Sequence, residues 1–74
     1  MRFTYDSEAD AAYLSLVDRD LRPGEADRQS DIIATPNGAG SLIVDFDVDG
    51  RMLGVEILAA SAVLPSDLLR DGGS

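Results

Sequence analysis

The chain has no cysteine, histidine or tryptophan among its 74 residues, and all six of its basic residues are arginine. Without cysteine it cannot form disulfide bonds, and without cysteine and histidine it lacks the usual zinc ligands. Without histidine, cysteine or lysine it also lacks the common nucleophiles and bases, so its serines have no histidine partner. We therefore expect a protein that is not an enzyme, with no catalytic residue and no cofactor.

Positive charge is scarce, because 6 basic residues stand against 14 acidic ones and leave a net charge of −8. An acidic surface repels phosphate groups, which argues against binding to nucleic acid or to anionic membranes. It permits a basic protein partner or a cation, and solubility is the simplest role for such charge.

Long apolar runs are also missing. No window approaches the roughly 18 apolar residues of a membrane span, and the first residues lack the apolar run of a signal peptide. We expect a soluble, cytoplasmic protein.

The length predicts one small β-rich domain over residues 1–74, with a frayed tail at residues 71–74. A chain this short buries only about 60% of its unfolded surface. Because it has no disulfide or zinc site to stabilise it, self-association and a hard-cation site are the remaining sources of stability.

The clearest structural pattern is a β-hairpin over Leu42–Leu58. Apolar residues alternate with polar ones on both sides of Asp47–Gly50, and β-branched and aromatic side chains are frequent. The sequence Asp-Val-Asp-Gly suits a tight turn closed by glycine in the left-handed region.

A second hairpin is predicted from strands Arg2–Asp6 and Ala12–Val17, with an acidic tip between them. Ser30–Thr35 alternates weakly and predicts an edge strand if it forms. Ala59–Leu64 predicts a short helix ended by Pro65, with one more turn at Ser66–Leu69. The expected fold is α+β: a single antiparallel sheet of four or five strands in a meander, with a short C-terminal helix.

Strand number in such a meander decides where the two acidic tips lie. With four strands the tips share one end of the sheet, whereas a fifth strand at Ser30–Thr35 sends them to opposite ends. The side chains expected to point inward are Phe3, Tyr5, Leu14, Leu16, Leu42, Val44, Phe46, Leu53, Val55 and Ile57.

Two segments resemble a known protein family. They are Tyr5–Leu14 (YDSEADAAYL) and Val44–Leu58 (VDFDVDGRMLGVEIL), and they look like the small prokaryotic family catalogued as domain of unknown function 2283. Phe46 stands where tyrosine is commoner in that family, and the loop Gln29–Ser41 is longer than usual. The resemblance implies a compact β-rich domain and brings no activity or ligand with it.

The spacing of an EF-hand calcium loop is matched by Asp45, Asp47, Asp49, Gly50 and Glu56. An EF-hand also needs a helix on each side of the loop. The preceding segment, residues 36–41, is rich in turn residues, and Leu42–Phe46 alternates as a strand. We therefore favour a hairpin whose aspartates make turn hydrogen bonds.

Asp45 and Glu56 share one face of the predicted hairpin and are expected to lie close to each other near the turn. Paired carboxylates can perform acid–base chemistry when one pKa is raised. Charged strand residues are more often a solvated face, and we favour that interpretation.

Apolar and aromatic side chains share the face that carries these two carboxylates. One short helix cannot cover both faces of a sheet, so we expect this second face to be an interface. Its candidate residues are Ile43, Met52, Leu58 and Tyr13.

Two functional hypotheses follow. The first is a non-catalytic protein-interaction or regulatory module that acts as a homodimer. The alternative is a small calcium-binding domain that uses the acidic hairpin Asp45–Glu56, with Asp45, Asp47, Asp49 and Glu56 as ligands.

Overall fold

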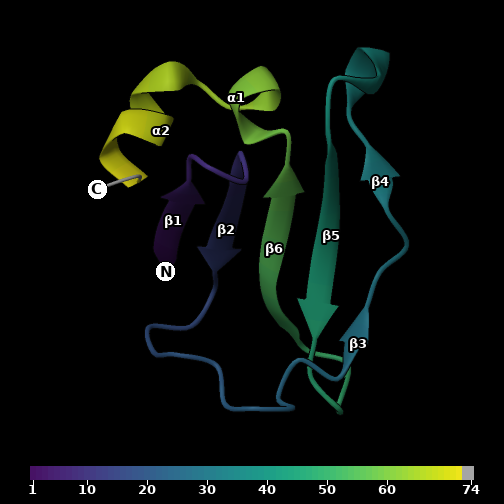
Figure 1. The fold of residues 1–74 in the computed structure, drawn as a ribbon. Coiled ribbons are helices and arrows are strands. Elements are labelled where there is room, and N and C mark those ends of the chain that lie inside the picture. Colours follow the sequence, from purple (N-terminus) through teal and green to yellow (C-terminus); the bar gives the residue numbers. More distant parts are fainter. Residues whose placement is uncertain (73–74) are drawn as a thin grey trace.

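The hairpin predicted for Leu42–Leu58 is present in the computed structural model, which describes residues 1–72 (Figure 1). Its strands are β5 (Ser41–Phe46) and β6 (Met52–Leu58). In the turn, Asp47 Oδ1 accepts hydrogen bonds from the backbone N–H groups of Asp49 and Arg51, both at 2.9 Å. Gly50 has φ +81°, a conformation that favours glycine. The predicted turn is therefore confirmed.

The predicted N-terminal hairpin is confirmed as β1 (Arg2–Asp6) and β2 (Ala11–Ser15). The side chain of Asp6 accepts hydrogen bonds from the backbone N–H groups of Glu8 and Ala9, which closes the tip. Strand β2 ends at Ser15, two residues before the predicted end.

The edge of the sheet beyond β5 is where the predicted strand number is wrong. The strand expected at Ser30–Thr35 forms only as β4 (Ile33–Ala34), and a further strand, β3 (Arg28–Gln29), precedes it. Both pair with β5, so residues 1–72 contain six strands. Between them Ser30 bonds to the backbone of Val44 through both its N–H and its hydroxyl, each at 2.9 Å. Because a side chain takes the place of one backbone partner there, the ladder is interrupted. A 3₁₀ turn, η1 (Pro36–Gly38), then leads into β5.

The strand order is β1-β2-β6-β5-β3, with every pair antiparallel, so the predicted meander is wrong. The segment 16–27 carries the chain from β2 to the far edge, and β6 then returns to pair with β2 (Figure 1). This crossing places the two hairpin tips at opposite ends of the sheet. It also lets β2 of the N-terminal hairpin pair directly with β6.

Within residues 1–72 two short helices follow β6, where the sequence predicted one short helix and one more turn after Pro65. They are α1 (Ala60–Val63) and α2 (Ser66–Gly72), and Pro65 separates them. Both lie beyond the end of β1 and β2, and α2 contacts β1 (Figure 1). Helix α2 includes residues 71 and 72 of the expected tail, whereas residues 73 and 74 lie outside the described residues. No helix within residues 1–72 is long and apolar enough to cross a membrane.

The strand register divides the sheet into two faces, because directly paired residues point to the same side. We call one the uncharged face. Across β1, β2, β6 and β5 it carries no charged side chain, and Arg28 of β3 lies at its edge opposite Phe46. Its large side chains in paired positions are Phe3, Tyr5, Leu14, Leu42, Val44, Val55 and Ile57.

We call the other side the mixed face, because it combines charged, polar and apolar residues. Its members include Arg2, Thr4, Tyr13, Ser15, Ile43, Asp45, Gly54, Glu56 and Leu58.

Burial does not follow the predicted division into core and surface. Leu53 is buried, but the large side chains of the uncharged face are only half-buried, and Leu16 is 37% exposed. Leu16 was predicted to point inward, and it is exposed because β2 has already ended at Ser15. The buried polar residues, Ser15 and Asp45, are both on the mixed face and only 8% exposed.

Candidate functional site

Tyr13 lies over Gly54 at the centre of the mixed face. Tyr13 belongs to β2 and Gly54 to the neighbouring β6, diagonal to each other across the strand pair. A Cβ atom placed on Gly54 would lie 2.6 Å from Tyr13 Cζ and 2.7 Å from Tyr13 Cε2. Glycine is therefore the residue that leaves room for the tyrosine ring against the sheet.

The buried Asp45 carboxylate holds this ring in position. Asp45 Oδ2 accepts a hydrogen bond from the Tyr13 hydroxyl at 2.9 Å, and Oδ1 accepts one from Gln29 Nε2 at 3.0 Å. Burial of Tyr13, followed by the hydrogen bond and charge of Asp45 and the charge of Glu56, raises the pKa of Tyr13 to about 12. The hydroxyl therefore stays protonated and acts as a donor, not as a base.

An open pocket of about 270 Å³ lies beside Tyr13 on the mixed face. Strands β1 and β2 form one side, and the loop after β2 forms the other. Its lining residues are Arg2, Thr4, Tyr13, Ser15, Arg19, Asp20 and Leu21. The arginine at each side already has an acidic partner: Arg2 Nη2 lies 3.0 Å from Asp20 Oδ1, and Arg19 binds Glu25.

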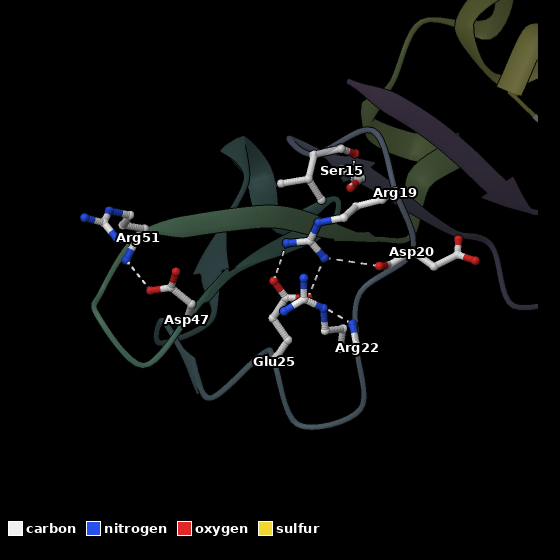
Figure 2. Close-up of polar contacts among 8 residues, drawn as sticks. Ser15, Arg19, Asp20, Arg22, Glu25, Asp47 and Arg51 are labelled. Carbon is white, nitrogen blue, oxygen red and sulfur yellow. Dashed lines mark hydrogen bonds and ion pairs between the residues drawn. The ribbon is translucent and has the colours of Figure 1, made fainter.

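The loop after β2, which borders this pocket, is held by a bidentate ion pair between Arg19 and Glu25 (Figure 2). Arg19 Nη1 and Nη2 donate to Glu25 Oε1 and Oε2 at 2.8 and 2.6 Å. Glu25 Oε1 also accepts a hydrogen bond from the backbone N–H of Arg22 at 2.9 Å. These bonds from Arg19, then from Arg22, lower the pKa of Glu25 to about 2. This ion pair was not predicted from the sequence.

We predict that this loop loosens in acid. Because the pKa of Glu25 is lowered from 4.5 to about 2 by folding, its stabilising effect is present above pH 4.5 and lost as the pH falls toward 2. Amide hydrogen exchange at Arg22 should therefore accelerate below pH 4.5, after correction for the intrinsic exchange rate. Glu25→Gln should show the faster corrected rate already at pH 6, and an identical pH profile for both proteins would contradict the prediction.

Three of the four predicted interface residues share the mixed face, as the sequence analysis expected. Tyr13, Glu56 and Ile43 form one row across β2, β6 and β5, and Leu58 lies on the same side two residues further along β6. Met52 is 50% exposed at the start of β6, opposite Phe46, where the register shifts. The Tyr13 hydroxyl already bonds to Asp45 within its own chain. The interface roles of all four residues stay predictions.

The acidic residues of the calcium pattern point to different places. Asp45 is buried against Tyr13 and Gln29, whereas Asp47 Oδ1 is bound to backbone N–H groups of the turn. Asp45 pairs with Gly54 and Glu56 with Ile43, so the two carboxylates share a face without lying directly opposite each other. Among the described residues, no three acidic side chains are close enough to hold one metal ion.

We predict that millimolar calcium leaves the melting temperature unchanged within error. A ligand that binds the folded state stabilises it by mass action, so a calcium site would raise the melting temperature. Magnesium at equal ionic strength is the control. A rise with calcium alone that disappears in Asp47→Asn would overturn the prediction.

Asp10 joins the first hairpin to the C-terminal helices, which the sequence analysis did not foresee. Its carboxylate accepts hydrogen bonds from the Tyr5 hydroxyl at 2.7 Å and from the N–H and hydroxyl of Ser61 at 2.9 and 2.7 Å. The Ser61 hydroxyl bond, followed by that of Tyr5, lowers the pKa of Asp10. No local pattern in the sequence pairs these two residues, because Asp10 and Ser61 lie 51 positions apart in the chain.

Comparison with protein families identifies the family to which the chain belongs. The model of the family described as protein of unknown function DUF2283 matches residues 2–61. The match covers most of the 74 residues, and the chain belongs to this family. Comparisons with curated proteins and with solved structures gave no significant match.

Proposed function

We propose that the chain is a non-catalytic protein-interaction module that acts as a homodimer. The observation that carries the proposal is a sheet without a second layer. In the described part of the chain no large side chain is fully buried, and the shortest dimension of the molecule is 18 Å. A sheet in this state gains stability when another surface covers it.

The accessible surface supports the same proposal. The chain exposes 4955 Å², whereas a compact monomer of its mass exposes about 4,400 Å², an excess of roughly 550 Å². A standard protein–protein interface buries about 800 Å² per partner, so the excess has the size of a large part of one such interface.

The carboxylates of Asp10, Glu25 and Asp45 bond to neighbouring side chains and so stabilise the fold, which supports a non-catalytic role. Asp45 and Asp10 accept hydrogen bonds from tyrosine hydroxyls, and Glu25 fixes a loop. The raised pKa of Tyr13 disfavours its use as a base near neutral pH. The net charge of −8 favours a basic protein as any further partner. The proposed place of action is the cytoplasm.

Light scattering coupled to size-exclusion chromatography tests the proposal. The full chain at high micromolar concentration should elute with twice its chain mass of 7.8 kDa. Dilution should shift the equilibrium toward the monomer because dimerisation depends on concentration. A monomeric mass at high micromolar concentration would overturn the homodimer.

A further inference from the structure

We infer that the second copy packs onto the uncharged face, sheet against sheet, leaving the mixed face and its pocket open. The inference rests on the proposed homodimer and assigns the surface that forms it. It differs from the sequence-based expectation, which placed the interface on the mixed face at Ile43, Met52, Leu58 and Tyr13.

Charge is the first reason for choosing the uncharged face. Each copy carries a net charge of −8, so two copies repel each other wherever acidic side chains meet. Across the four long strands, the uncharged face presents the rows Phe3-Leu14-Val55-Val44 and Tyr5-Ala12-Ile57-Leu42. The mixed face would bring the Glu56 carboxylate of each copy into the contact, together with the Arg2–Asp20 ion pair at its rim. Only the uncharged face lets two acidic copies meet with their charges directed outward.

Burial is the second reason. The mixed face is already partly covered by its own chain, because Tyr13 lies over Gly54 and Asp45 is buried beneath Tyr13 and Gln29. On the uncharged face Leu14, Val44 and Val55 remain half-buried although they occupy the middle of the sheet. Within residues 1–72, Figure 1 shows no helix lying over β6 or β5 on either side. The central apolar row of the uncharged face is therefore less covered than the row Ser15-Gly54-Asp45 of the mixed face, all three of which are buried.

Geometry is the third reason. Two sheets pack face to face at about 10 Å, with their inner side chains interdigitated. A two-fold axis through the uncharged face would set the same rows of both copies against each other, as isologous dimers require. The roughly 550 Å² of excess surface per chain is of the order that such a contact covers.

Single cysteines test the inference, because the chain has none of its own. Val44→Cys and Ile43→Cys are matched: the two residues are neighbours in β5, both half-buried, and they point to opposite faces. The rate of thiol alkylation is measured at low and high protein concentration. We expect Val44→Cys to react at least about tenfold more slowly at high concentration, because its thiol becomes covered, as the mass-action dependence of dimers requires. Ile43→Cys should react at the same rate at both concentrations.

A charge pair of variants gives an independent readout by light scattering. Val44→Asp should elute as a monomer, whereas Ile43→Asp should keep the mass of the unmodified protein. If Val44→Asp fails to fold, the cysteine experiment still decides, because cysteine is a small and nearly apolar replacement for valine.

The outcomes separate the inference from the proposed function. If the unmodified chain is a dimer but Ile43→Cys is the protected variant, or neither variant is protected, the face is wrong and the homodimer stands. If the unmodified chain is a monomer at all concentrations, the homodimer itself is wrong. Protection of Val44→Cys alone supports both.

Discussion

Replacing Gly54 with alanine is expected to lower the free energy of unfolding by about 1–3 kcal/mol, the usual cost of adding a methyl group where none fits. The new Cβ would lie 2.6 Å from Tyr13 Cζ. If the ring moves toward the pocket to make room, its hydroxyl leaves the buried Asp45, so relaxation has a cost as well. Urea denaturation at one fixed protein concentration measures the change, since the stability of a dimer depends on concentration.

A double-mutant cycle provides the control for this prediction. In a Tyr13→Ala background the obstructing ring is absent, so the added cost of Gly54→Ala should fall close to zero. An equal cost in both backgrounds would show that the alanine disturbs the sheet for a reason other than the tyrosine.

Tyr13→Phe is expected to cost about 1–3 kcal/mol, because it removes a donor from a buried carboxylate and leaves the ring in place. Asp45 is 8% exposed and would keep only the hydrogen bond from Gln29 Nε2. The loss should appear as a lower urea midpoint with an unchanged denaturant slope.

The chain contains a matched control for this substitution. Tyr5 also donates to an aspartate, Asp10, at 2.7 Å. Asp10 is less buried and keeps both bonds from Ser61, so Tyr5→Phe should lower the midpoint by less than Tyr13→Phe. The reverse order would mean that Asp45 is not the more dependent of the two carboxylates.

These effects on stability can be distinguished from effects on the proposed dimer by varying the protein concentration. Gly54, Tyr13 and Asp45 stabilise the mixed face from within one chain, whereas Val44 and Val55 are expected to be covered by the second copy. Substitutions of the first kind should change stability at every protein concentration. Substitutions of the second kind should change the concentration dependence, which keeps the two roles distinguishable.

Several features were determined by the sequence alone, because they depend on residues close together in the chain. The Asp47–Gly50 turn follows from an aspartate that bonds its own following backbone and a glycine free to adopt φ +81°. The two hairpins follow from period-two alternation on either side of such turns. The same alternation correctly placed Tyr13, Ile43 and Leu58 on one face.

Only the tertiary structure decided the strand order and what becomes buried. The pairing of β2 with β6 depends on where the segment 16–27 crosses, and no local pattern specifies that crossing. The split between β3 and β4 depends on Ser30 meeting Val44, 14 residues along the chain. The burial of Asp45 depends on Tyr13 and Gln29, which are 32 and 16 residues away. Hydrophobic alternation predicts which side chains share a face, but the burial of each face is set by contacts between distant segments. Here those contacts bury the row Ser15-Gly54-Asp45 of the mixed face more fully than the apolar row Leu14-Val55-Val44.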